Sequence, residues 1–176
     1  SGVLCLAWTP QSGSILSGSL DHLARSWPLS ELGRKKELPG HNASIRGCAF
    51  TPDCAKLVTA SRDYTLRSWD PVSGDHLQSF QGHEGAVQAL DISLDGTRLL
   101  SGSTDGTLRL WDLKSGRCLL RIEAHSDPVT CASFGPGGLL FSGARDKTLR
   151  GWHPESGEEQ ITLAGHEGWV RTCCPL

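Results

Sequence analysis

The stretch Ser101–Asp112, SGSTDGTLRLWD, contains a small polar strand end, a tight turn and an apolar strand that finishes in Trp-Asp. Its aspartate follows the first serine by four positions, and its tryptophan follows the aspartate by six. The same frame recurs as SGSLDHLARSW from residue 17, TASRDYTLRSWD from residue 59 and SGARDKTLRGWH from residue 142. The tryptophans of the four copies, Trp27, Trp69, Trp111 and Trp152, lie 42, 42 and 41 positions apart. Registered copies of this length indicate a repeat protein.

Each repeat predicts four short strands joined by tight turns, and no stretch shows a useful helical period. Turn residues such as Pro52-Asp53 and Asp95-Gly96 fall between the strands. The repeats span approximately residues 1–39, 40–81, 82–123 and 124–164, with an incomplete unit over 165–176. The predicted strands are Val3–Thr9, Ser14–Ser19, Leu23–Pro28, Lys36–Leu38, Ile45–Thr51, Lys56–Ser61, Thr65–Asp70, His76–Gln81, Val87–Ser93, Arg98–Ser103, Thr107–Asp112, Cys118–Glu123, Val129–Gly135, Leu139–Ala144, Thr148–His153, Glu159–Ala164 and a lone strand Val170–Leu176.

A unit of four short strands cannot bury both faces of its own sheet, so each unit must stack on its neighbours. Antiparallel four-stranded units that follow one another and stack radially form a β-propeller. The sequence therefore predicts an all-β fold with four four-stranded antiparallel blades and one extra strand.

The composition argues against several classes of function. The 176 residues carry a formal net charge of -2, which is not the charge of a general polyanion binder. The longest apolar runs are too short to cross a membrane. The seven cysteines include no Cys-x-x-Cys pair, which argues against a zinc site, and we expect no metal or cofactor. Cys5, Cys48 and Cys131 fall in first strands as small apolar residues, which suits a reducing compartment, cytoplasmic or alternatively nuclear.

A Gly-His pair followed about 27 residues later by Trp-Asp resembles the WD-repeat β-propeller family. The pairs Gly40-His41 with Trp69-Asp70 and Gly82-His83 with Trp111-Asp112 carry the resemblance. Repeat one departs from the pattern with Trp27-Pro28, and repeat four departs with Ala124-His125 and Trp152-His153.

The resemblance implies a larger propeller of about seven blades, of which this chain would be a segment. The sequence contains no Met, and both ends cut through repeat sequence, so we expect the intact protein to continue in both directions. Four blades alone would leave two apolar faces open, through which two copies could associate.

The repeated His, Ser or Thr, Asp and Trp residues predict a buried hydrogen-bond network in each blade. A buried indole N–H needs an acceptor, which a hydroxyl supplies, and an imidazole can link that hydroxyl to the carboxylate at the turn. By resemblance this is the family's structural tetrad. Its members are His41, Thr59, Asp63, Trp69; His83, Ser101, Asp105, Trp111; His125, Ser142, Asp146, Trp152; and, without a histidine, Ser17, Asp21, Trp27.

The same residue types also invite a reading as a catalytic triad, for example His83, Ser101 and Asp105. We reject that reading, because a catalyst is needed once whereas this set recurs in several blades with a fixed tryptophan. We therefore expect no enzymatic activity in this chain.

Variable positions around the tetrads predict a docking surface. These positions flank the first-strand Val or Ile of each repeat or precede the tetrad aspartate, and they hold four arginines, a tryptophan and no acidic residue. Arginine and tryptophan are common interface anchors, and guanidinium forks suit carboxylates and phosphates. The alternative is that the arginines are solvated and pair with Glu84, Asp127 or Glu167. The candidate partner-binding residues are Arg46, Arg62, Gln88, Thr104, Arg145, Trp169 and Arg171.

A second column of arginines lies two positions before each repeat tryptophan, at Arg25, Arg67, Arg109 and Arg150. We interpret it as structural, with the side-chain stems packed between blades and the guanidinium groups at the rim. A nucleic-acid stripe is the alternative, against which the net charge argues.

With no catalytic or metal motif, the predicted function is that of a non-enzymatic scaffold or recognition module for other proteins or peptides, including acidic or phosphorylated ones. The alternative is a regulatory or ligand-sensing propeller that controls an enzymatic or signalling domain elsewhere in a longer polypeptide.

Overall fold

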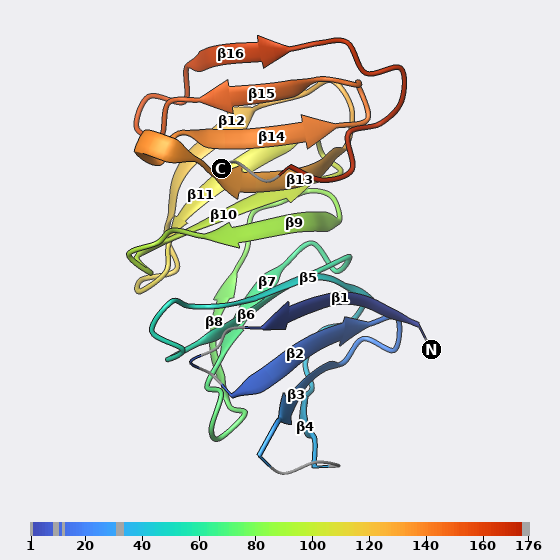
Figure 1. Cartoon of the computed structure of the whole chain (residues 1–176), viewed down its shortest axis with the longest axis vertical. Helices are drawn as coiled ribbons and strands as arrows, with labels where there is room; N and C mark the ends of the chain where they lie inside the picture. The colour runs from blue at the N-terminus through green and yellow to red at the C-terminus, as the bar shows by residue number, and fades with distance from the viewer. Residues whose placement is uncertain (1, 9–10, 12, 31–33, 174–176) are drawn as a thin grey trace.

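The computed structural model describes residues 2–8, 11, 13–30 and 34–173. Within these ranges the chain forms four four-stranded antiparallel sheets, here called blades 1 to 4, and each blade uses four consecutive strands (Figure 1). Blade 1 contains β1 (Val3–Trp8), β2 (Ser14–Ser19), β3 (Ala24–Pro28) and β4 (Lys36–Leu38); blade 2 contains β5 (Ile45–Phe50), β6 (Leu57–Ser61), β7 (Leu66–Trp69) and β8 (His76–Phe80); blade 3 contains β9 (Val87–Ile92), β10 (Arg98–Ser103), β11 (Thr107–Asp112) and β12 (Cys118–Glu123); blade 4 contains β13 (Val129–Phe134), β14 (Leu140–Ala144), β15 (Leu149–Trp152) and β16 (Glu159–Leu163).

All sixteen observed strands begin and end within one residue of the predicted strands. The predicted lone strand Val170–Leu176 is wrong over residues 170–173, which form no strand, and residues 174–176 lie outside the described ranges. Among the described residues, no second strand lies beside this segment to pair with it. Its tie to blade 4 is local: the Val170 N–H donates to the Ala144 carbonyl at 3.1 Å, and the Val170 carbonyl accepts the Thr130 hydroxyl.

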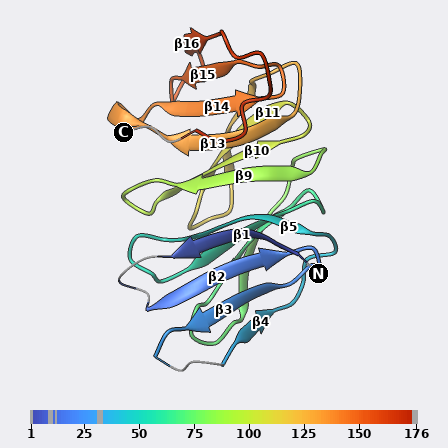
Figure 2. The ribbon, with the colours of Figure 1, turned by 45° about the vertical axis from the view of Figure 1, so that its right-hand side comes forward.

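The four blades follow one another, and the first strand of each blade is its innermost strand (Figures 1 and 2). The innermost strands of neighbouring blades contact each other: β1 contacts β5, β5 contacts β9, and β9 contacts β13. Each junction encloses an apolar cluster that neither blade could bury alone. Between blades 2 and 3, for example, Phe80 of β8 packs edge-on against Trp111 of β11, with the ring centroids 5.9 Å apart. The repeat therefore stabilises itself through the contacts between units.

The outward faces of the first and last blades show what these junctions contribute. Trp69 and Trp111 are 1% exposed, but Trp27 at the same frame position of blade 1 is 36% exposed. At the other end, Leu163 of β16 is 54% exposed, whereas its equivalent Phe80 is fully buried. The difference arises because the described structure places no blade against these two faces.

Each inner strand contains a register irregularity near its start, which turns one side chain out of the pleat. In blade 2 it falls between Ile45 and Gly47, and so at Arg46. A short 3-10 turn, η1 (Pro136–Gly138), replaces a plain turn between β13 and β14. No helix among the described residues is long and apolar enough to cross a membrane.

Candidate functional site

In blades 2, 3 and 4 the structure brings the predicted tetrad residues together in a continuous hydrogen-bonded chain. In blade 3 the Trp111 indole N–H donates to Ser101 Oγ at 2.9 Å, and Ser101 Oγ lies 2.8 Å from His83 Nε2. His83 Nδ1 lies 2.9 Å from Asp105 Oδ2. This geometry suits an imidazole with its proton on Nδ1, donated to the carboxylate, and with Nε2 accepting the serine hydroxyl.

The other two complete tetrads repeat this geometry closely. The imidazole-to-carboxylate distances are 2.8 Å for His41 and 2.7 Å for His125. Both histidines lie 2.8 Å from their hydroxyl partners, Thr59 and Ser142. Three copies in one chain show that the network is part of the blade architecture.

A second hydroxyl, which the sequence analysis missed, completes each of these networks. Thr65, Thr107 and Thr148 follow the tetrad aspartate by two positions, and each donates its hydroxyl to the other carboxylate oxygen at 2.7 Å. The Thr-two-after-Asp pattern is visible in repeats two to four, whereas repeat one has Leu23. It could have been recognised as a turn in which the carboxylate accepts both the hydroxyl and the backbone N–H of the same residue.

The carboxylates in these networks are held ionised. Burial alone would raise the pKa of Asp63 and of Asp105, but hydrogen bonds from the imidazole, the threonine hydroxyl and a backbone N–H outweigh it and hold both pKa values well below the usual range. The pKa of Asp146 is lowered against burial by Thr148 and His125. Burial lowers the pKa of His125, despite the neighbouring carboxylate. In blade 4, neutral pH therefore leaves a neutral imidazole bonded to a carboxylate.

Blade 1 has the bond between the tryptophan and the serine, but its aspartate bonds an arginine in place of a histidine. The Trp27 indole N–H donates to Ser17 Oγ at 2.8 Å, as in the other blades. Asp21 Oδ2 instead lies 2.8 Å from Arg25 Nη1, and Arg25 also contacts Glu37 at 3.2 Å. The guanidinium of Arg25 thus supplies the donor that the imidazole supplies elsewhere.

The arginine column before each tryptophan does take structural positions. Arg109 Nη2 donates to the Gly82 carbonyl at 2.8 Å, and its guanidinium lies 5.8 Å from the Trp111 ring centroid. A side chain at Gly82 would meet Arg109 Nη1 at 2.8 Å, and Gly82 also has a φ of 149°. This explains the glycine of the Gly-His pair, because only glycine combines that φ with the close approach.

The catalytic-triad interpretation is wrong because the hydroxyl groups are not accessible to a substrate. Ser101 and Thr59 are fully buried, and each hydroxyl already receives an indole N–H. A nucleophile there could not reach a substrate, so these residues serve the scaffold.

The predicted docking residues lie along one edge of the blades. Three of the residues before the tetrad aspartate donate their backbone N–H to the loop carbonyl that precedes the inner strand: Arg62 to Ser44, Thr104 to Ala86 and Arg145 to Pro128. These bonds hold the turn between the second and third strands of each blade next to the start of the inner strand. Arg46, Gln88 and Thr130 follow at the irregular position of the strand. Arg62 and Arg145 are exposed, whereas Arg46, Gln88 and Thr104 are half-buried.

At the blade 4 end of this edge, the exposed Trp169 lies between two cations. Its ring centroid is 4.3 Å from the Arg145 guanidinium carbon and 5.8 Å from that of Arg171. An open cavity of about 440 Å³ is lined by Gly168, Trp169 and Arg171. A guanidinium over an indole face keeps its N–H donors at the ring edge available to an anion.

The arginines on this edge are not neutralised within the described chain. The ion pairs between described residues include none from Arg46, Arg62, Arg145 or Arg171 to Glu84, Asp127 or Glu167. Arg46 Nε is moreover buried without a hydrogen-bond partner. We call this edge, defined by Arg46, Arg62, Gln88, Thr104, Arg145, Trp169 and Arg171, the arginine surface.

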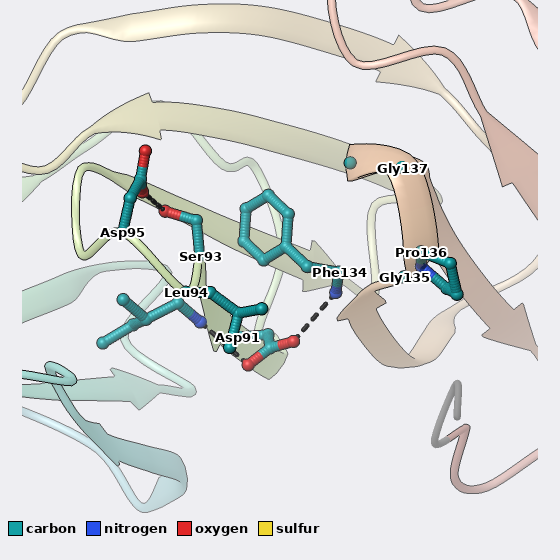
Figure 3. Close-up of a pocket in the computed structure, with 10 residues that line it drawn as sticks. Asp91, Ser93, Leu94, Asp95, Phe134, Gly135, Pro136 and Gly137 are labelled. Atoms are coloured by element: carbon teal, nitrogen blue, oxygen red, sulfur yellow. Dashed lines mark hydrogen bonds between the residues drawn. The ribbon is translucent and has the colours of Figure 1, made fainter.

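A pocket of about 620 Å³ lies at the opposite ends of the inner strands, between the β9–β10 turn and η1 (Figure 3). Leu94 and Phe134 contribute apolar surface to it. Its carboxylates are already occupied: Asp91 Oδ2 accepts the Phe134 N–H at 2.8 Å, and Asp95 accepts the Ser93 hydroxyl at 2.6 Å. We therefore interpret the pocket as a feature of the junction between blades 3 and 4. No group of three or more metal-binding side chains gathers among the residues described.

Comparison with known proteins agrees with the blade pattern. The family model described as WD domain, G-beta repeat, matches residues 1–28, 33–70, 74–112 and 116–153, which together make up most of the chain. No curated protein sequence matches the chain closely enough to be a relative. The chain therefore belongs to the WD40 family, whose domains generally act as scaffolds or modules for protein–protein interaction.

Proposed function

We propose that this chain is a non-enzymatic recognition module that docks an acidic or phosphorylated segment of a partner protein on the arginine surface. The observation that carries the proposal is the set of four arginines on one edge without acidic partners among the described residues. Guanidinium groups in that state favour a carboxylate or phosphate, with which they form paired hydrogen bonds.

The tetrads support this proposal because they have a structural role in each blade and leave binding to other residues. Each complete tetrad holds the turn that carries Arg62, Thr104 or Arg145, because its carboxylate accepts the backbone N–H two residues later, and its own side chains are largely buried. The residue before the tetrad aspartate can therefore vary between blades without disturbing the fold. Variation on a rigid support is the usual basis of specificity in binding surfaces.

Charge reversal at the centre of the surface tests the proposal. The double variant Arg46→Glu, Arg62→Glu should lose capture of partners from a cell lysate, because it replaces both donors with repelling carboxylates. The matched control is Lys114→Glu, Arg117→Glu on the exposed β11–β12 turn, which changes the net charge equally and should retain capture. Circular dichroism verifies that both variants fold.

A phosphatase-treated lysate separates the two classes of partner. Capture lost after treatment identifies phosphate as the ligand group, whereas capture that persists identifies carboxylates. Undiminished capture by the folded Arg46→Glu, Arg62→Glu variant would rule out the arginine surface as the docking site.

A further inference from the structure

Where the inner strands of two neighbouring blades meet, one position of the repeat in the first blade faces another position of the repeat in the second. The first position faces the second-strand glycine or alanine of its own blade, as Cys5 faces Gly18 and Gly47 faces Ala60. The second, one residue further along in the next blade, lies opposite the tetrad hydroxyl, as Cys48 lies opposite Thr59. By this register the pairs are Cys5 with Cys48, Gly47 with Leu90, and Ala89 with Ala132; Gly47 approaches Leu90 directly, and the members of each other pair belong to one apolar cluster.

The spacing between these positions is short enough for a covalent link. At the junction of blades 2 and 3, a Cβ built on Gly47 would lie 3.4 Å from Cγ of Leu90. Leu90 Cγ stands one bond beyond Cβ, where a cysteine carries its sulfur, so a cysteine at the second position would place its sulfur against the Cβ of the first, as a disulfide requires. At the equivalent place between blades 1 and 2, Cys48 Sγ reaches across to the Leu16 carbonyl oxygen of blade 1 at 3.7 Å, and the Cys5 and Cys48 thiols lie close enough to shift each other's pKa. Both cysteines pack on the apolar cluster of that junction.

The two thiols differ in their surroundings. The neighbouring Cys48 thiol lowers the pKa of Cys5 against the effect of burial, and the Arg46 guanidinium lowers it further. The neighbouring Cys5 thiol and burial raise the pKa of Cys48. Because the thiolate is the nucleophilic form, Cys5 is the attacking sulfur and Cys48 is the resolving one.

We propose that Cys5 and Cys48 form an oxidation site, at which hydrogen peroxide converts the two thiols into a disulfide that links blades 1 and 2. The Cys5 thiolate attacks the peroxide oxygen, the O–O bond breaks, and the leaving oxygen departs as water after taking a proton. The sulfenic acid formed on Cys5 is then attacked by the Cys48 sulfur, and its hydroxyl leaves as a second water. Two thiols and one peroxide thus give one disulfide and two waters.

Both sulfurs are half-buried, so the site admits a small oxidant but shields the pair from larger disulfides. Cys118 differs in each respect: it is exposed, and its sulfur contacts Arg109 and the Leu120 carbonyl instead of a second thiol. It therefore serves as the internal comparison. The disulfide would form beside Arg46 and would tie the arginine surface of blade 2 to blade 1.

Peptide mapping tests the proposal. The Cys131 thiol interacts with that of Cys173, which lowers the pKa of Cys131, so the chain used carries Cys131→Ser to remove this second pair. It is treated with hydrogen peroxide, blocked with N-ethylmaleimide and digested without reductant. We expect one cross-linked species joining the Cys5 and Cys48 peptides, lost on reduction. With Cys48→Ser added, the cross-link should disappear and Cys5 should be captured as a sulfenic acid by a 1,3-dicarbonyl probe.

Two controls distinguish a specific Cys5–Cys48 disulfide from random oxidation of cysteines. Cys118→Ser should leave the cross-link unchanged, and oxidation in denaturant should abolish the preference for the Cys5–Cys48 pair, because the pairing depends on the blade junction. Maleimide on both Cys5 and Cys48 after peroxide treatment of the folded chain would overturn the proposal. Cross-links from Cys5 to Cys118 as abundant as those to Cys48 would overturn it equally.

Discussion

The tetrad carboxylate is the residue on which each complete blade turn depends. Asp105 accepts an imidazole N–H, a threonine hydroxyl and the backbone N–H groups of Glu84 and Thr107. One side chain thus joins the incoming loop, the turn and the third strand. A group with this many donors cannot be removed without leaving several of them unpaired.

Replacing this carboxylate should therefore be costly. Asp105→Ala should lower the free energy of unfolding by about 1–3 kcal/mol, because it leaves buried donors unsatisfied. Urea denaturation followed by tryptophan fluorescence measures the change. Asp95→Ala, at an exposed turn of the same blade, should have a smaller effect, and an unchanged midpoint for Asp105→Ala would contradict the role assigned to the tetrad.

The same groups predict how stability depends on pH. Burial lowers the pKa of His125 below its ordinary value of 6.5, so the unfolded chain binds the proton more readily and stability falls as pH drops below about 6.5. The pKa values of Asp63, Asp105 and Asp146 are lowered from 3.8, so their contribution is complete above about pH 4 and is lost as pH falls further. Thermal unfolding from pH 8 to pH 3 should show both declines, and His125→Gln should flatten only the first.

The turn between the second and third strands shows how one element repeats with different residues. The residue after the tetrad aspartate has a positive φ in every blade: His22 at 70°, Tyr64 at 73°, Gly106 at 80° and Lys147 at 68°. Only blade 3 uses glycine there. A side chain at Gly106 would also meet the His125 carbonyl at 2.6 Å, a contact that links this turn to the next blade.

Exchange of residues at this position should have opposite effects in two blades. Gly106→Ala should lower the free energy of unfolding by about 1–2 kcal/mol, because it adds left-handed strain and a clash with a backbone oxygen. Lys147→Gly should not destabilise blade 4, since it relieves the same strain. Denaturation midpoints of the two variants decide this, and an equal loss for both would show that φ does not set the effect.

The sequence predicted the strands to within one residue, because alternation, turn residues and a registered period all agree in each repeat. It also predicted the tetrads by position. It could not predict that Arg25 would bond Asp21 in blade 1, since that contact depends on which side chain fills the space of an absent imidazole. The Cys5–Cys48 contact was equally hidden, because one-residue differences of register between neighbouring blades decide which side chains meet.

At the scale of the whole molecule, stability is distributed over the three junctions between blades. Each junction buries an aromatic or aliphatic outer-strand residue of one blade under the next, as Leu38, Phe80 and Ile122 show. Leu163 holds the corresponding place on blade 4, and Trp27 of blade 1 holds the place at which Trp111 packs against Phe80. The two exposed faces are therefore built as halves of a junction.

Two such faces on one chain should make it associate with itself, because burying them follows the same physical rule as the internal junctions. The native mass of the 176-residue chain, measured by sedimentation over a range of concentrations, should rise above that of a monomer. Leu163→Glu should lower this association at least tenfold by placing a charge in the contact, whereas Leu94→Glu, at a 95% exposed turn away from both faces, should leave it unchanged. A monomeric mass at all concentrations would show that an open blade face is tolerated in water without a partner.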